Sequence, residues 1–141
     1  MIRSNYNFED AKGISNYLKD LEVFLNSTPP ATDIELMFTY LGDMRAHYAT
    51  LSHVLGQAKA LRAKAIMDVV DEAEKEVYNR IKNSSTLVIE YAEAKKPNIA
   101  FVYNKADFLK RALMDATSQI TTMIAYRKEE MRLSHNKVNQ K

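Results

Sequence analysis

A proline-free segment organises this chain: residues 32–81 read TDIELMFTYLGDMRAHYATLSHVLGQAKALRAKAIMDVVDEAEKEVYNRI. Its apolar residues recur in alternating steps of four and three, the heptad spacing that keeps one stripe of a helix facing a partner. This first seam comprises Met37, Leu41, Met44, Tyr48, Leu51, Leu55 and Ala58. A continuous helix over the segment would be a rod roughly 70 Å long. Because an apolar seam of that length cannot cover itself, the segment predicts a second long helix packed against it, from this chain, from another copy, or from both.

A second seam with the same spacing lies in residues 98–133. It comprises Ile99, Val102, Ala106, Leu109, Leu113, Ala116, Ile120 and Met123. The next position in register is Arg127, so we expect the helix to leave the bundle there and to carry Arg127, Lys128 and Arg132 into solvent or onto a partner. The second seam spans only about 38 Å. We therefore expect the uncovered part of the rod, residues 66–81, to be shared between copies in a homo-oligomer.

Short signals mark where the helices begin and end. Asn7 is a good capping residue and predicts a first helix over 7–26, which stops before a pair of prolines. Thr32 with Glu35 three residues later forms a capping box. The long helix is therefore expected to begin at residue 32 and to extend to residue 82.

The segment between the two long helices is short and polar at its start. Residues 83–86, NSST, break the rod and can cap a short helix over 85–95, and residues 134–141 read as a polar tail. The sequence thus predicts a single all-α domain over 1–141. Its architecture is an elongated helical bundle or helical hairpin of two long helices, plus an N-terminal helix and a short connecting helix.

Composition favours a soluble intracellular protein with a polarised charge. There are no cysteines, no apolar run reaches the roughly 18 residues that span a bilayer, and the first residues are polar, so we expect a cytoplasmic location. The net charge is +2, but residues 1–94 carry 10 Lys and Arg against 14 Asp and Glu, whereas residues 95–141 carry 10 against 4. The basic C-terminal third can contact phosphates, or it is simply a solvated helical surface.

No set of residues predicts catalysis, a cofactor or a metal. There is no glycine-rich phosphate loop, and His47 and His53 lie six residues apart on a helix, where they do not face one another. An acidic run over 68–76 has carboxylates at helical spacing that could hold a divalent ion, but such runs are more often solvated faces. We therefore expect a protein that is not an enzyme.

Aromatic residues alternate with positive charge in the C-terminal third. Tyr91, Phe101, Tyr103, Phe108 and Tyr126 are interleaved with lysines and arginines, the combination that binds single-stranded nucleic acid by base stacking and phosphate neutralisation. The same tyrosines also suit a helix–helix contact with a wet edge.

The pattern and size of the chain resemble the UvsY-type recombination mediators of tailed phages and similar small phage helical proteins. The resemblance covers residues 32–133 and is carried by Leu41 to Ile66, with KALRAK at 59–64, and by Tyr103 to Arg132, with ITTMIAYRK at 120–128. It implies ring-like homo-oligomers in the host cytoplasm that bind single-stranded DNA and help to load a recombinase or displace a single-strand binding protein. The nucleic-acid-binding residues that it implies are Lys59, Arg62, Lys64, Lys105, Arg111, Arg127 and Lys128.

Two other functions compete with this one. An exposed helix face can dock on a partner protein, as in a regulator or inhibitor that uses no nucleic acid. The chain can also be a purely structural oligomeric adaptor.

Gly42 and Gly56, 14 residues apart on the same side of the rod, are either tolerated glycines or places where another backbone approaches closely.

Overall fold

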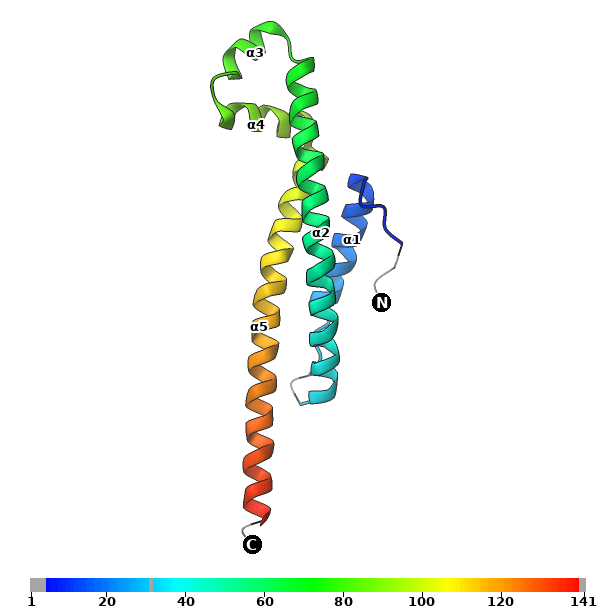
Figure 1. Cartoon of the computed structure of the whole chain (residues 1–141), viewed down its shortest axis with the longest axis vertical. Coiled ribbons are helices and arrows are strands. Elements are labelled where there is room, and N and C mark those ends of the chain that lie inside the picture. Colours follow the sequence, from blue (N-terminus) through cyan, green and yellow to red (C-terminus); the bar gives the residue numbers. More distant parts are fainter. Residues whose placement is uncertain (1–4, 31, 140–141) are drawn as a thin grey trace.

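The computed structural model describes residues 5–30 and 32–139 and confirms the all-α fold with two long helices packed together. The described residues form five helices and no strand. These are α1 (Ala11–Leu25), α2 (Ile34–Glu72), α3 (Lys75–Ile81), α4 (Ser85–Lys95) and α5 (Pro97–Asn139). Figure 1 shows α2 and α5 running side by side in opposite directions, with α1 on their flank and α3 and α4 at one end.

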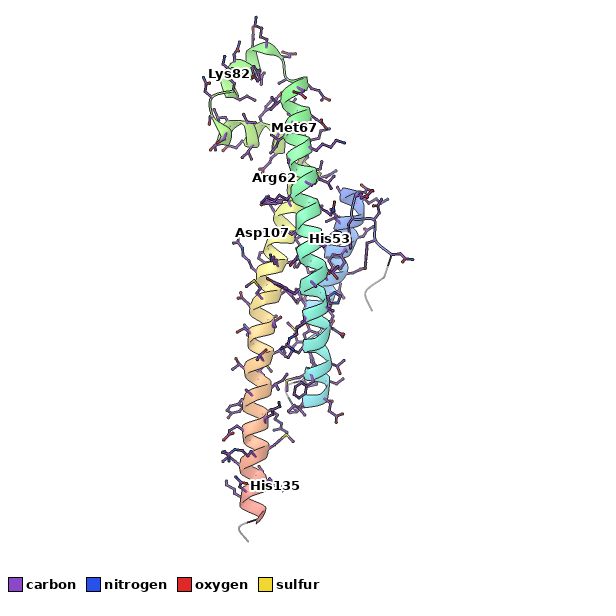
Figure 2. All side chains as sticks on the ribbon, in the orientation of Figure 1. His53, Arg62, Met67, Lys82, Asp107 and His135 are labelled. Atoms are coloured by element: carbon purple, nitrogen blue, oxygen red, sulfur yellow. The ribbon has the colours of Figure 1, made fainter. Side chains whose placement is uncertain are left out.

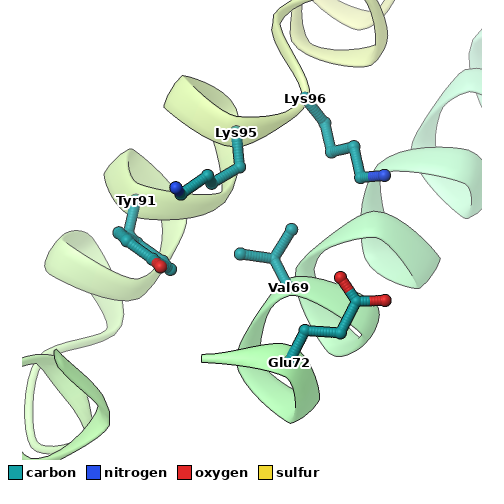
Figure 3. Close-up of a pocket in the computed structure, with 5 residues that line it drawn as sticks. All are labelled: Val69, Glu72, Tyr91, Lys95 and Lys96. Atoms are coloured by element: carbon teal, nitrogen blue, oxygen red, sulfur yellow. The ribbon is translucent and has the colours of Figure 1, made fainter. Parts of the chain in front are cut away.

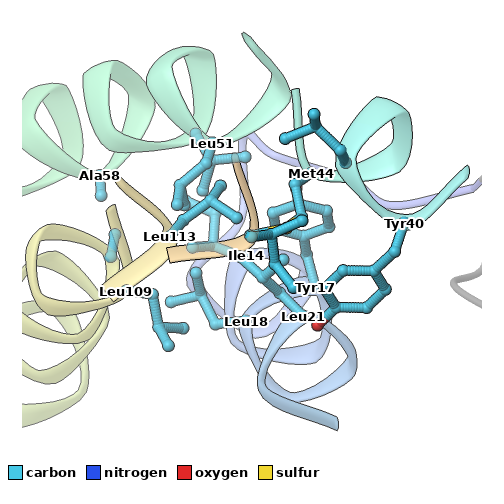
Figure 4. Close-up of a cluster of buried hydrophobic side chains, with 14 of the residues drawn as sticks. Ile14, Tyr17, Leu18, Leu21, Tyr40, Met44, Leu51, Ala58, Leu109 and Leu113 are labelled. Atoms are coloured by element: carbon cyan, nitrogen blue, oxygen red, sulfur yellow. The ribbon is translucent and has the colours of Figure 1, made fainter. Parts of the chain in front are cut away.

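The core lies where α1 fills one side of the space between α2 and α5. Figure 4 shows Ile14, Tyr17, Leu18 and Leu21 of α1 meeting side chains of the two long helices, and all four are at most 2% exposed. Both predicted seams are buried over most of their length, which follows from their heptad spacing. Tyr48 departs most, at 37% exposed, and Leu55, Ile99, Ala116 and Met123 are half-buried. Tyr40 and Val54 of α2, which lie beside the seam, are also buried. This is because α2 packs against both α1 and α5, so its buried stripe is wider than one seam.

The predicted start of α2 is wrong by two residues. The cap is Asp33, whose carboxylate accepts a hydrogen bond of 3.0 Å from the backbone N–H of Leu36, and Thr32 stays outside the helix. The Asp33 N–H donates to the carbonyl of Pro30 at 3.0 Å. That turn fixes Asp33 as the last non-helical residue, where its side chain replaces the expected capping box.

The predicted end of the long helix at residue 82 is also wrong. The helix is continuous through Gly56 but ends at Glu72, where Ala73 is extended, and the chain turns into α3. The last turn of α2 carries Asp71 and Glu72 and no basic residue, an unfavourable charge for a helix C-terminus. Because α4 folds back against α2, the chain itself covers Val69, so part of the stretch expected to need another copy is already buried.

The first helix begins at Ala11, not at residue 7. Asp10 caps it by accepting from the Lys12 N–H at 3.2 Å, while the Asn7 side chain accepts from the Glu9 N–H in a separate turn. The segment that precedes α1 packs closely on this helix at Asn7, because a Cβ on Gly13 would lie 1.9 Å from the Asn7 carbonyl oxygen. Gly13, which only weakens a helix in isolation, is therefore needed for this close approach.

The short helix is confirmed at residues 85–95, with the Ser84 side chain as its cap. The last helix begins at Pro97, a residue suited to the first helical position, and it includes residues 134–139, which were expected to be a polar tail. Residues 140–141 of that tail lie outside the described residues. Ile124 is the last buried side chain among the residues up to 137, whose burial is described, and Figure 1 shows α5 running on past the start of α2. The helix therefore emerges from the bundle as expected, but slightly later than Arg127, because Lys128 still lies over the Phe38 ring of α2. Within residues 5–30 and 32–139, no helix combines the length and apolarity needed to cross a membrane.

Candidate functional site

The seven basic residues that the resemblance implied do not form one surface. Arg62 is half-buried between three helices: its guanidinium is 3.1 Å from the Glu93 carboxylate of α4 and 4.7 Å from the centre of the Tyr103 ring of α5. Figure 2 places Arg62 on α2 close to where α4 and α5 meet it. This arginine ties three helices together, and its charge is already matched by Glu93.

Three more of the seven cations are neutralised by nearby carboxylates. Lys105 forms an ion pair with Glu22 of α1 and so fastens α1 to α5. On the surface of α5, Arg111 pairs with Asp107 at 2.7 Å and Arg127 pairs with Glu130 at 3.1 Å. Exposed pairs of this kind add little stability, but they lower the net charge that a phosphate would meet.

The remaining three cations are far from one another or point in different directions. Lys59 and Lys64 are exposed, and neither forms an ion pair among the described residues. Five residues on a helix turn by about 140°, so these two side chains leave α2 on different sides. Lys128 lies over the Phe38 ring of α2, with its Nζ 4.8 Å from the ring centre.

The structure instead shows a groove that the sequence reasoning missed, formed between α2 and α5. It consists of two depressions that both use Arg45. The first, about 390 Å³, is lined by Arg45, Tyr48, Met114, Thr117 and Ser118. The second, about 350 Å³, is lined by Phe38, Leu41, Gly42, Arg45, Thr121, Ile124, Ala125 and Lys128. We call these two depressions together the α2–α5 groove.

The groove has an apolar floor and a positively charged rim. Phe38 is 45% exposed and Met114 is 52% exposed, and no acidic residue lines either depression. The rim carries Arg45 and Lys128, together with Lys110, whose Nζ lies 5.6 Å from the centre of the Tyr48 ring. None of these three cations belongs to the ion pairs of the described residues. In the sequence Tyr48 simply continues the apolar seam, and only the packing of α2 on α5 reveals that this side is open and that Tyr48 is 37% exposed.

A smaller pocket of about 240 Å³ lies between the end of α2 and α4, lined by Val69, Glu72, Tyr91, Lys95 and Lys96. Figure 3 shows Lys95 beside Tyr91, and its Nζ is 5.6 Å from the ring centre. Lysines and a glutamate line the same pocket, so it lacks the single sign of charge that would select an ionic ligand. We give it no role.

The three histidines have separate surroundings. His47 packs between Tyr17 and Phe24, and its Nδ1 lies 3.4 Å from the Tyr17 hydroxyl oxygen. Burial lowers the pKa of His47, and nearby Asp43 opposes this shift, whereas burial and Tyr6 raise the pKa of Tyr17 to about 12 against a hydrogen bond to Thr50. Figure 2 shows His135 near the far end of α5, away from His53. Among residues 5–30 and 32–139, no three His, Asp or Glu side chains form a group that could hold a metal.

The lowered pKa of His47 predicts that acid destabilises the fold at this residue. The unfolded chain takes up a proton at the ordinary histidine pKa, before folded His47 does, so this contribution to stability is present above that pKa and is lost as the pH falls through the lower folded value. We expect the melting temperature of the native chain to fall more between about pH 7.5 and pH 5.5 than that of a His47→Gln variant. Thermal melts followed by circular dichroism test this. The matched control is His53→Gln, which removes an imidazole from an exposed position of the same helix. Equal slopes for all three proteins would show that His47 does not contribute.

The candidate site is thus the α2–α5 groove. Comparison of the chain with protein-family models, with curated proteins and with solved structures finds no match. The resemblance to UvsY-type mediators therefore stays a prediction.

Proposed function

We propose that the chain is a non-catalytic helical protein that binds and regulates a partner protein through the α2–α5 groove. The observation that carries the proposal is the groove itself, in which large apolar side chains remain exposed between two long helices. Surface-exposed apolar side chains gathered in one concave place are typical of interaction sites, whereas single ones are ordinary.

The energetics favour an occupied groove. Phe38, Tyr48 and Met114 keep 37–52% of their surface in contact with solvent. Burying apolar surface contributes about 25 cal/mol per Å², and an aromatic or methionine anchor in a pocket is a common centre of binding energy. The cations on the rim would then favour, among apolar partners, those that carry negative charge.

Single-stranded nucleic acid is the second candidate ligand, favoured by one specific observation. Arg45 and Lys59 are 14 residues apart on α2, and Lys110 and Lys128 are 18 apart on α5, so each pair lies on nearly the same side of its helix. None of the four has a carboxylate partner among the described residues. Against this candidate, the Phe38 and Tyr48 rings are covered on one face by lysine ammonium groups, which leaves less aromatic surface for bases to stack on.

Site-specific photo-crosslinking tests the proposed function. A photoreactive phenylalanine analogue at Ser118, which lines the groove and is exposed, is introduced into the chain in the cells that naturally make it. We expect it to capture a discrete protein, and the same analogue at exposed Lys64, outside the groove, should not. Capture at neither position, or equally at both, would contradict the proposal. A gel shift with oligothymidine that is strong at low salt and falls steeply with added salt would support nucleic acid instead.

A further inference from the structure

The α2–α5 groove has the dimensions and chemistry of a seat for one more helix, which goes beyond binding a partner in general. On α2 the lining runs from Phe38 to Tyr48, and on α5 from Met114 to Lys128. At about 1.5 Å per residue the longer side extends roughly 21 Å, the length of about four turns of an α-helix. The two depressions share Arg45 and together extend over that length, which matches a helix of about 14 residues.

The chain itself shows how such a helix docks, because α1 occupies the neighbouring position. It presents Ile14, Tyr17, Leu18 and Leu21, at helical spacing, to both α2 and α5. Its Glu22 carboxylate forms an ion pair with Lys105 of α5. The docked helix therefore combines an apolar stripe with an acidic residue at its edge, facing a lysine of α5.

The groove repeats this pattern on the opposite side, without an occupant in the chain. Its apolar floor corresponds to the surface that α1 covers, and Arg45, Lys110 and Lys128 correspond to Lys105. A helix packed on each side of a pair of long helices gives a four-helix bundle. The three cations without carboxylate partners among the described residues specify the charge that the incoming helix should carry.

Gly42 adds an independent observation. It lines the groove, and a Cβ built on it meets nothing within 4 Å, so no contact within the chain requires glycine there. A glycine in the interior of a helix is unfavourable relative to other residues, yet this one leaves the floor free of a side chain. A helix lying in the groove could approach the α2 backbone closely at this point, as small residues allow at helix crossings.

We infer that the α2–α5 groove binds an acidic amphipathic α-helix of a partner protein, one with an apolar stripe at i, i+3, i+4 and i+7 flanked by glutamate or aspartate. This inference rests on the proposed function and names the chemistry of the partner. The incoming helix packs its stripe over Phe38, Leu41 and Met114, and its carboxylates meet the cations of the rim. It completes a four-helix arrangement in which α1 and the partner helix lie on opposite sides of α2 and α5.

Fluorescence anisotropy with a defined probe tests the inference. The probe is a fluorescein-labelled peptide of about 14 residues with leucines in the stripe and glutamates beside it, and the control peptide has lysines in place of the glutamates. We expect saturable binding of the glutamate peptide to the native chain and at least about 10-fold weaker binding of the lysine peptide.

Two glycine variants locate the binding. Gly42→Leu places a side chain in the groove and should raise the Kd of the glutamate peptide at least about 10-fold. Gly56→Leu is the matched control, because Gly56 is also exposed in α2 with nothing within 4 Å of its Cβ, but it lies outside the groove. It should change the Kd less than about 2-fold. Both variants should keep the native melting temperature or exceed it, because each removes a glycine from a helix interior.

Each alternative occupant gives a different result. No saturable binding of the glutamate peptide, equal binding of the two peptides, or equal loss in both glycine variants would overturn the inference. So would oligothymidine binding that Lys110→Glu with Lys128→Glu removes, which would assign the groove to nucleic acid. A dimer in light scattering that becomes a monomer in Gly42→Leu would assign it to a second copy. If the peptide fails while Ser118 still captures a protein, the proposed function stands and only the helix chemistry is wrong.

Discussion

Leu51→Asp is expected to unfold the protein. Leu51 is fully buried at the centre of the α2 stripe, against α1 and α5. The substitution removes a leucine from the core, which costs about 2–5 kcal/mol, and places a carboxylate where it has no partner, which costs several kcal/mol more. Since domains are stable by only about 5–15 kcal/mol, the sum is comparable to the whole stability. Circular dichroism should show a large loss of helix and no cooperative melting transition.

Ala49→Asp is the matched control for this variant. Ala49 lies in the same turn of α2 but is exposed, so its carboxylate stays in water. We expect a melting temperature within a few degrees of the native value, since surface substitutions usually change stability by less than about 0.5 kcal/mol. A cooperative native-like melt for Leu51→Asp would show that the buried face of α2 is assigned incorrectly.

Leu113→Ala is expected to destabilise the fold strongly without abolishing it. Leu113 is fully buried on α5, where Figure 4 shows it among side chains of α1 and α2. Removing most of a buried leucine side chain leaves a cavity and costs about 3 kcal/mol. For a chain of this size that corresponds to a fall of roughly 10 °C in melting temperature. Urea denaturation should give the same loss with an unchanged slope.

Met114→Ala provides the comparison at the next residue. Met114 is 52% exposed and lies in the groove instead of the core, so its truncation should cost less than about 1 kcal/mol. The pair separates the two sides of α5. If Met114→Ala were as destabilising as Leu113→Ala, the Met114 side chain would be part of the core. That result would contradict the assignment of an open groove on this side of α5.

The helices were predictable because their signals are local. The seam of Leu109 and Leu113, the Ser84 cap of the short helix and the departure of α5 beyond Ile124 all follow from spacing along the chain. The ends of α2 were less predictable. Thr32 and Asp33 are both good caps, and only the turn from Pro30 selects Asp33.

The candidate site was much less predictable. The resemblance predicts that Arg62 and Lys105 bind nucleic acid, and in the structure both pair with acidic residues more than 30 positions away in the chain. A basic residue in a sequence carries no sign of whether a carboxylate from another helix will neutralise it. Arg45 was not among the expected site residues, yet it belongs to both depressions of the groove.

The sequence by itself determined that this protein is built from helices and which stripe of each long helix is apolar, because hydrophobic periodicity and capping are encoded within a few residues. Only the tertiary structure decided which stripe meets which. It placed α1 on one side of α2 and α5 and left the other side open, with Tyr48 at its edge. Contacts between distant segments depend on how whole helix surfaces fit together, so the groove arises from the packing and not from any one stretch of the chain.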